Sequence, residues 1–255
     1  LVEIWPKSFK LIKYSELDST NSEAKRLAFK DEMNVCIFTR IQKNGKGSRG
    51  RKWISGSKNL TASFLIYPSG NFIEFSHRTF VASLALFDSF VYAGIKNKDL
   101  TLKWPNDVLL KQRKVSGILL ESVVNKNSKK SALIIGIGVN LYSYPNKINL
   151  LNSSKIKPTS LFSILGHKTP SPDQMLIYIA NSLQFWEKKY IKHGFGYIKN
   201  AWLNFSHTIG KKLEVEFKGK MLKGSFFGIN DNGSLNILVE KRVVEINVGD
   251  VFIYN

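Results

Sequence analysis

Residues 45–51 combine side-chain types that bind phosphate groups. The segment reads Gly-Lys-Gly-Ser-Arg-Gly-Arg, with three glycines and three cations in seven residues. Glycine lets the backbone turn its N–H groups toward a ligand, and cationic side chains offset phosphate charge. The pattern is neither a P-loop nor a Rossmann fingerprint, and a basic surface loop has the same composition. We therefore treat it as a candidate anion-binding loop and expect its structure to be irregular.

A second group of polar residues follows one of the expected strands. Asn106 and Asp107 come directly after Pro105, which fixes the turn. Lys114 lies seven residues beyond Asp107, where the next strand begins, and Gly117 follows three residues later. A lysine that enters a strand beside a close-approach glycine can reach into a cleft. The same spacing also describes an exposed hairpin lysine.

Hydroxyl and amide side chains form the third group, Ser19-Thr20-Asn21. Thr20 and Glu23 have the spacing of a capping box, which predicts that a helix begins here. The N-terminus of that helix would present free backbone N–H groups. A helix cap alone would also explain these residues.

An α+β arrangement must position the three groups. Gly136 and Gly138 lie inside an apolar strand, where glycine often marks close approach of a ligand or another backbone. Ser171 and Pro172 have the types expected at the start of a helix that runs to about Tyr190. The periodicity predicts strands at 35–42, 60–67, 100–103 and 133–141, a hairpin over 108–124 and a helix over 80–91.

The sequence changes character near Ser206, where we place a boundary between a domain of residues 1–206 and a domain of residues 207–255. From Leu213 onward, apolar and charged residues alternate, and tight turns separate the alternating runs. This pattern predicts a small β-barrel. The expected fold class is therefore α+β, a mixed β-sheet with packed helices followed by a small C-terminal β-barrel.

The composition limits the function classes. The 255 residues include 38 Lys and Arg against 19 Asp and Glu, a net charge of +19. Such a chain attracts nucleic acid, nucleotide phosphates, anionic lipid or an acidic protein. The cations are spread from Lys7 to Arg242 rather than gathered in one block, and a lysine-rich proteome would give the same total.

Several other function classes are disfavoured. The single cysteine, Cys36, excludes a disulfide framework and a multi-thiolate metal site within one chain. The four histidines lack metal-ligand spacing, and no apolar run reaches the length of a membrane span. The first ten residues lack the apolar stretch of a signal peptide. We therefore expect a cytoplasmic location.

Taken together and in order, the motifs resemble the biotin–protein ligase family. The resemblance covers roughly the first 140 residues, and the C-terminal β-barrel is more loosely similar to that family's SH3-like domain. Some members carry an N-terminal helix-turn-helix domain and repress transcription. Because 18 residues precede Ser19, we expect a ligase of the short form without that DNA-binding domain. The segments that carry the resemblance are 19–21, Gln42 with 45–53, 103–107, 113–121 and 135–140.

The resemblance implies a two-step reaction with ATP, biotin and Mg²⁺. The biotin carboxylate attacks the α-phosphate of ATP to give biotinyl-5′-AMP and pyrophosphate. A lysine of a biotin carboxyl carrier protein then attacks the mixed anhydride. The expected partner is thus this carrier protein, with no specific DNA and no membrane. The oligomeric state stays open, with a homodimer as one alternative.

The resemblance also implies roles for individual residues. Lys114 binds the carboxylate and then the α-phosphate and is the first catalytic candidate, while Asp107 orients the acceptor amine or the metal. Mg²⁺ is held mostly through the phosphates. The implied biotin-binding residues are Ser19, Thr20, Asn21, Gln42, Lys46, Gly47, Ser48, Lys114, Gly117 and Gly136. The implied nucleotide-binding residues are Lys46, Arg49, Arg51, Trp53, Asn106, Lys114 and Asn140.

One position departs from the family pattern. Ser48 stands where the loop usually has an arginine, so the chain either holds the adenylate more loosely or compensates through Arg49. Two other functions are weighed beside the ligase. A lipoate–protein ligase shares the fold and the acyl-adenylate chemistry, but its usual Arg-Arg-x-Ser-Gly-Gly-Gly signature is absent. A basic nucleic-acid-binding module is supported by the net charge alone.

Overall fold

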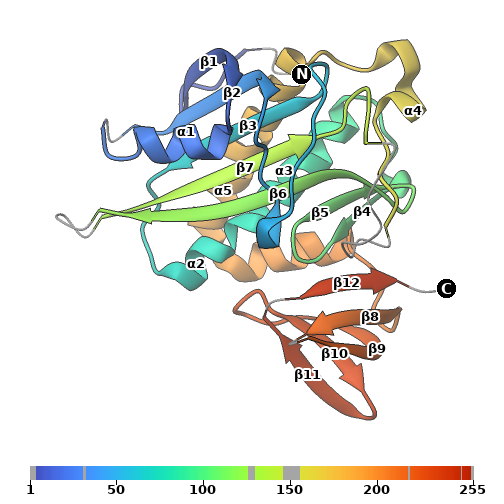
Figure 1. Cartoon of the computed structure of the whole chain (residues 1–255). Helices are drawn as coiled ribbons and strands as arrows, with labels where there is room; N and C mark the ends of the chain where they lie inside the picture. The colour runs from blue at the N-terminus through green and yellow to red at the C-terminus, as the bar shows by residue number, and fades with distance from the viewer. Residues whose placement is uncertain are drawn as a thin grey trace.

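The computed structural model describes residues 4–30, 33–125, 130–145, 156–217, 219–247 and 249–253. These residues form two β-sheets, and helices pack on the larger one (Figure 1). The fold class is therefore α+β with a mixed sheet, as the sequence predicts.

The larger sheet has seven strands in the order β1-β2-β3-β7-β6-β5-β4. β1 runs parallel to β2, and the other neighbouring pairs are antiparallel. The central strands β3 and β7 are buried along nearly their whole length because both faces of the sheet are covered. The strands are β1 (Lys10–Leu17), β2 (Val35–Gln42), β3 (Leu60–Ile66), β4 (Leu100–Lys103), β5 (Asp107–Leu110), β6 (Arg113–Val124) and β7 (Ser131–Val139).

Helices cover both faces of this sheet. The described helices are α1 (Thr20–Leu27), α2 (Phe72–Ser76), α3 (Arg78–Tyr92), α4 (Phe162–Leu165) and α5 (Pro172–Asn204), with short 3₁₀ turns η1 (Ser48–Gly50), η2 (Asn97–Asp99) and η3 (Gly166–Lys168). In Figure 1, α3 and α5 lie behind the sheet and α1 lies in front. Side chains alternate between the faces of β2, so Cys36 and Phe38 join the core under α3 and α5, while Val35 and Ile37 pack with α1.

β5 and β6 form the hairpin that the sequence predicts. Lys111 and Gln112 at its turn have positive φ values of 47° and 61°, as a type I′ turn requires at both central residues. Val108 pairs with Ser116 and Leu109 with Lys114, so Val115 of β6 is the extra residue of a β-bulge. The turn and the bulge together bring Lys114, which follows the turn on β6, back toward the beginning of β5.

α5 begins where the sequence predicts and ends later. Ser171 accepts a hydrogen bond from the Gln174 backbone N–H (3.2 Å), and Pro172 is the first helical residue. The helix passes the expected end at about Tyr190, with an interruption at Gly194, whose φ of 74° favours glycine. Buried apolar residues on the final turns account for the extension. Although α5 has 33 residues, no helix in the described ranges is both long and apolar enough to cross a membrane.

The C-terminal residues form a five-stranded antiparallel sheet in the order β11-β10-β9-β8-β12. Within the described residues β11 and β12 are its two edges, so the predicted barrel is not closed. The indole N–H of Trp104 donates to the Gly233 carbonyl oxygen (3.0 Å) and links the two sheets. The domain boundary at residue 206 remains a prediction. The strands are β8 (Lys212–Phe217), β9 (Lys220–Ile229), β10 (Leu235–Val239), β11 (Arg242–Ile246) and β12 (Asp250–Ile253).

Candidate active site

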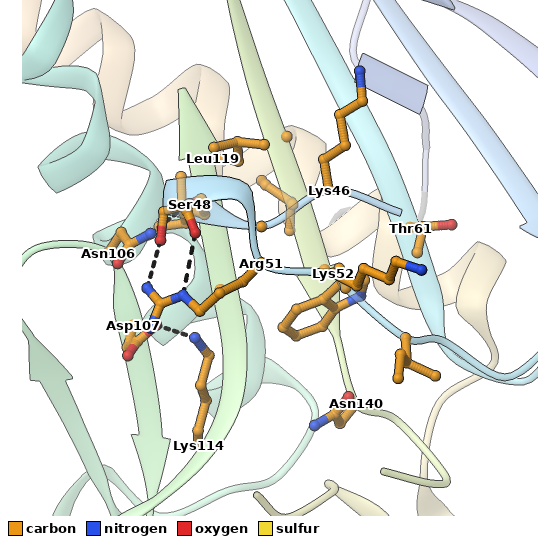
Figure 2. Close-up of a pocket in the computed structure, with 18 of the residues that line it drawn as sticks. Lys46, Ser48, Arg51, Lys52, Thr61, Asn106, Asp107, Lys114, Leu119 and Asn140 are labelled. Atoms are coloured by element: carbon orange, nitrogen blue, oxygen red, sulfur yellow. Dashed lines mark hydrogen bonds and ion pairs between the residues drawn. The ribbon is translucent and has the colours of Figure 1, made fainter. Parts of the chain in front are cut away.

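A cleft of about 550 Å³ gathers the motifs that the sequence singles out. Its walls come from the start of α1, the end of β2, the basic loop, the β4–β5 turn, β6, β7 and β12. Figure 2 shows part of this lining, with the basic loop opposite Asp107 and Lys114. Arg49 is a predicted site residue that is not among the lining residues. The predicted residues that do line the cleft are Ser19, Thr20, Asn21, Gln42, Lys46, Gly47, Ser48, Arg51, Trp53, Asn106, Asp107, Lys114, Gly117, Gly136 and Asn140.

The basic loop has no regular strand or α-helix, as the sequence predicts, but one isolated bridge closes it into a small hairpin. Lys46 and Lys52 form an antiparallel bridge, and the Gly47 N–H donates to the Arg51 carbonyl oxygen (2.7 Å). Arg49 sits at the tip in the left-handed region, with φ 57° and ψ 40°. The two arms of the hairpin therefore line the cleft, whereas Arg49 at the tip does not.

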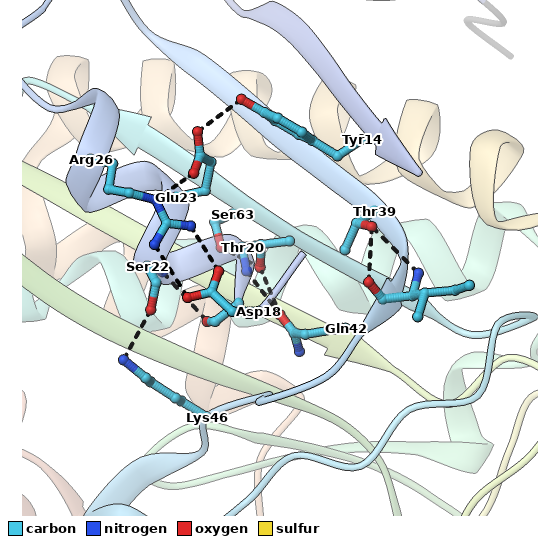
Figure 3. Close-up of polar contacts among 12 residues, drawn as sticks. Tyr14, Asp18, Thr20, Ser22, Glu23, Arg26, Thr39, Gln42, Lys46 and Ser63 are labelled. Atoms are coloured by element: carbon cyan, nitrogen blue, oxygen red, sulfur yellow. Dashed lines mark hydrogen bonds and ion pairs between the residues drawn. The ribbon is translucent and has the colours of Figure 1, made fainter. Parts of the chain in front are cut away.

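The hairpin is also attached to α1. The Lys46 Nζ donates to the Ser22 hydroxyl oxygen at 3.0 Å (Figure 3). Ser22 lies on the first turn of α1, beside the residues of the Ser-Thr-Asn motif. The contact brings one cation of the loop over the part of the cleft that those residues line.

Lys114 and Asp107 form an ion pair in the cleft, with 2.5 Å between Nζ and Oδ1 (Figure 2). Lys103 approaches the other carboxylate oxygen at 3.3 Å. Lys103 and Asp107 are both buried, with 4% and 8% of their surface exposed, respectively. One carboxylate thus holds two ammonium groups, and Lys114 is the more exposed of the two.

The two lysines keep Asp107 ionised. Burial alone would raise the pKa of the Asp107 carboxyl, but the positive charges of Lys114 and Lys103 outweigh burial and lower the pKa below its usual value. A carboxylate with a lowered pKa is a weak base at neutral pH. Its chemistry here is to orient ammonium groups rather than to remove protons.

Neutral hydroxyl and amide groups line the opposite part of the cleft. The Thr20 backbone N–H donates to Gln42 Oε1 (2.9 Å), so the Gln42 amide nitrogen points away from Thr20 (Figure 3). The Ser63 hydroxyl donates to Asn21 Oδ1 (2.6 Å) and lies 2.7 Å from the Thr20 hydroxyl oxygen. The Asn21 amide nitrogen donates to Glu121 Oε2 (2.8 Å). Both ends of the Asn21 side chain are therefore fixed.

The helix cap differs from the predicted capping box. Ser19 is the N-cap, and its hydroxyl oxygen accepts from the Ser22 N–H at 3.4 Å. Thr20 is the first helical residue, so its side chain does not cap the helix and reaches Ser63 instead. Glu23 accepts from the Tyr14 hydroxyl (2.8 Å) and from Arg26 (2.6 Å).

Glycines in β6 and β7 make room for side chains of the site. A side chain at Gly136 would overlap Asn21, and one at Gly138 would overlap the Trp53 indole. The close approach that the sequence predicts at these glycines is therefore made by Asn21 and Trp53. The half-buried indole of Trp53 rests against β7, and its ring centroid is 5.9 Å from Lys114 Nζ.

The two asparagines of the predicted nucleotide site support the backbone around it. The Asn106 amide donates to the Ile118 carbonyl oxygen (2.6 Å). The buried Asn140 amide donates to the Thr159 carbonyl oxygen (3.0 Å). Each side chain keeps its own carbonyl oxygen as a further acceptor.

Three residues of the site were missed at the sequence level. Lys103 and Glu121 belong to the motif segments without an assigned role, and Ser63 lies in the strand predicted at 60–67. A polar residue inside an otherwise apolar strand was the available signal, because a buried polar group needs a partner. The identity of that partner could not be deduced, since Asn21 is 42 residues from Ser63 and 100 from Glu121.

Comparisons with known proteins agree with this architecture. Residues 14–140 match the biotin/lipoate A/B protein ligase family. A Paracoccus denitrificans biotin–[acetyl-CoA-carboxylase] ligase is 34% identical over 218 residues, which cover 86% of this chain and 90% of the relative. The Bacillus subtilis bifunctional ligase/repressor BirA is 28% identical over 246 residues, 94% of this chain and 73% of the relative. A biotin protein ligase from Aquifex aeolicus, solved in complex with biotin and ATP, has a TM-score of 0.78 and 26% identity and covers 96% of this chain and 99% of that chain.

Gly136→Ala should lower the free energy of unfolding by about 1–3 kcal/mol, because the new methyl group must displace the fixed Asn21 side chain. Urea unfolding measures the effect. Gly196→Ala is the matched control, since Gly196 lies in α5 with open space around it and should change stability by less than about 1 kcal/mol. Equal effects of the two substitutions would contradict the packing argument.

The Asp107 carboxylate should stabilise the protein in a pH-dependent way. Its pKa is lower in the folded than in the unfolded chain, so its contribution is complete above the unfolded pKa of about 3.9 and disappears as the pH falls through the folded pKa. Asp107→Asn should be less stable than the native chain at pH 7, and the difference should shrink below about pH 4. Urea unfolding of both proteins between about pH 7 and pH 2.5 tests this, since all other carboxylates cancel in the comparison. A difference that stays constant over that range would refute it.

Proposed function

The chain belongs to the biotin/lipoate A/B protein ligase family, and we infer that it is an ATP-dependent biotin–protein ligase. It activates biotin as biotinyl-5′-AMP and transfers biotin to a lysine of a biotin carboxyl carrier protein. The observation that carries this function is the division of one cleft into a neutral part, around Thr20 and Gln42, and a cationic part, around Lys114 and Arg51. Biotin has the same division, with a neutral ureido ring and an anionic carboxylate.

The neutral part suits the ureido ring. Such a ring needs paired donors and acceptors and no charge. The bond from the Thr20 N–H to Gln42 Oε1 supports an orientation in which Gln42 offers its amide nitrogen to a ligand carbonyl. Ser19 and Thr20 hydroxyls provide further donors and acceptors. The apolar chain of biotin would then run past Gly117 toward Lys114.

The cationic part addresses the main obstacle of the first step, the approach of two anions. Two unit charges 4 Å apart interact by about 1 kcal/mol in water and by about 4 kcal/mol in a partly dry cleft. Fixed cations must therefore offset the repulsion between carboxylate and phosphate. Arg51 and Lys114 line this part of the cleft, and the Asp107 contact leaves Lys114 two further N–H donors for biotin carboxylate and α-phosphate oxygens.

Amide formation completes the reaction. The acceptor lysine must attack as a free amine, so its nitrogen forms a bond to the acyl carbon while the bond from that carbon to the AMP oxygen breaks. AMP leaves with the electron pair, and the amine proton passes to solvent or phosphate. Asp107 is suited to orienting the incoming amine, because its lowered pKa makes it a weak proton acceptor.

Mg²⁺ enters with the nucleotide in this proposal. Among the described residues, no three His, Cys, Asp or Glu side chains lie close enough together to hold a metal ion. Asp107 is already bound by two lysines. Mg²⁺ commonly binds through phosphates and water with one or two carboxylates. The ion would shield phosphate charge, and Asp107 is the carboxylate that the described lining of the cleft could offer it.

Location and further partners also belong to the proposal. The use of ATP fits a cytoplasmic enzyme. The cations are spread along the chain, which supports general attraction of anions rather than a surface that reads one DNA sequence. Both a monomer and a homodimer are compatible with a complete cleft in one chain.

Pyrophosphate release should distinguish the proposed ligase from a lipoate ligase of the same family. The native chain with ATP should release pyrophosphate when biotin is added and remain near background with lipoate. A biotin carrier domain should then become labelled on one lysine, measured by mass spectrometry. Release that depends on lipoate instead, or salt-sensitive nucleic-acid binding without any ATP turnover, would refute the proposal.

Lys114→Ala should reduce biotin-dependent adenylation by at least about 100-fold, which is the usual loss when one preorganised charge donor is removed. Rates of pyrophosphate release measure it. Lys98→Ala is the matched control, because Lys98 is an exposed lysine of η2 outside the cleft. Near-native adenylation by a folded Lys114→Ala variant would remove Lys114 from the mechanism.

A further inference from the structure

Ser48 and Arg51 are the two corner residues of the turn at the tip of the basic hairpin. The Arg51 backbone N–H donates to the Ser48 carbonyl oxygen at 3.3 Å. Arg49 and Gly50 between them have positive φ values of 57° and 71°, as in a type I′ turn. Corner residues of such a turn face each other across the hairpin, so their side chains lie on the same face.

The Arg51 guanidinium makes two further contacts with Ser48. Its Nε donates to the Ser48 carbonyl oxygen (3.1 Å), and its Nη2 donates to the Ser48 hydroxyl oxygen (2.8 Å) (Figure 2). Two bonds from one planar group fix its orientation as well as its position. Ser48 is neutral, so these contacts remove none of the positive charge that Arg51 brings to the cleft.

An arginine at position 48 would have a different effect. It would place a second guanidinium on the face that Arg51 already occupies, directly across the turn, where like charges repel. It would also remove the hydroxyl oxygen that accepts from Arg51. With serine at position 48, the loop lacks a second guanidinium, but the guanidinium of Arg51 has a fixed orientation.

We propose that Ser48 is a positioning residue that holds Arg51 for the nucleotide phosphates, and that this contact replaces the arginine usual at this point of the loop. The proposal rests on the ligase function inferred above. Arg49 does not supply the missing charge, since its left-handed backbone places it outside the residues that line the cleft. Ser48 then acts through Arg51 and does not bind biotin itself.

The contact with Ser48 should favour nucleotide binding because it preorganises the Arg51 side chain. A free arginine loses rotamer freedom when it binds a phosphate, and a side chain already held in place loses less. Loss of the Ser48 hydroxyl should therefore weaken binding of ATP and of the adenylate. Binding of biotin alone, at the neutral part of the cleft, should not change.

A double-mutant cycle tests the proposal. Ser48→Ala, Arg51→Ala and the double variant are compared with the native chain for the KM of ATP, for kcat and for the dissociation rate of biotinyl-AMP. Ser48→Ala should raise the KM of ATP about 10-fold with little change in kcat, since one charge-assisted hydrogen bond is lost. In the Arg51→Ala background the same change should have no effect, because the residue through which Ser48 acts is absent.

Three controls sharpen the cycle. Ser48→Thr keeps a hydroxyl and should stay within about twofold of the native KM. Ser57→Ala removes an exposed hydroxyl outside the cleft and should behave as native. Biotin affinity without ATP, measured by calorimetry, should be equal in the native chain and Ser48→Ala.

Several results would overturn the proposal. Additive effects of Ser48→Ala and Arg51→Ala would mean that Ser48 does not act through Arg51. Weaker biotin binding by Ser48→Ala without ATP would make Ser48 a direct biotin contact. Slower adenylate release by Ser48→Arg than by the native chain would mean that the loop lacks a cation. Biotin-dependent pyrophosphate release by the native chain is measured first, and its absence would refute the ligase function rather than the role of Ser48.

Discussion

A buried carboxylate between two ammonium groups determines the geometry of the cationic part of the cleft. Lys103 ends β4, Asp107 begins β5 and Lys114 lies on β6, so the two ion pairs join three consecutive strands at one end of the sheet. Removing one partner from such a group leaves a buried charge without compensation. The resulting loss of folding free energy is larger than the net stabilisation that the intact group provides. The type I′ turn between β5 and β6 and the bulge in β6 bring Lys114 back to the start of β5, where it contacts Asp107.

The charge of the cleft is more informative than the charge of the chain. Its described lining contains five cations (Lys46, Arg51, Lys52, Lys103 and Lys114) and one carboxylate, Asp107. Many other cations form exposed ion pairs on the surface, such as Lys43 with Glu16, and exposed pairs contribute little to stability. In the cleft, Lys46 and Arg51 each contact a neutral serine oxygen. A neutral oxygen restrains the side chain without offsetting its positive charge.

Local signals in the sequence predicted local structure well. The β5–β6 hairpin, the start of α5 and the polar start of α1 depend on residues within a few positions of one another, and the structure has all three. Features that depend on distant partners were not predictable in this way. The hydroxyl of Ser63 and the carboxylate of Glu121 act on Asn21 only because β3 and β6 flank β7 beneath α1. The hairpin form of the basic loop was missed because its turn places Arg49, a residue other than glycine, at positive φ.

The neutral and cationic parts of the cleft favour one orientation of the biotin that we propose to bind there. Burial raises the pKa of Glu121, but the hydrogen bonds from Lys25 and Asn21 outweigh burial and lower the net pKa, so this carboxylate stays ionised and holds the Asn21 amide nitrogen. The Asn21 side chain therefore has both ends occupied and packs against Gly136. A ligand carboxylate in this part would meet a second carboxylate behind a neutral amide, whereas at the other end it would meet Lys114. In the proposed function the ring therefore occupies the neutral part and the carboxylate the cationic part, which is the orientation that adenylation requires.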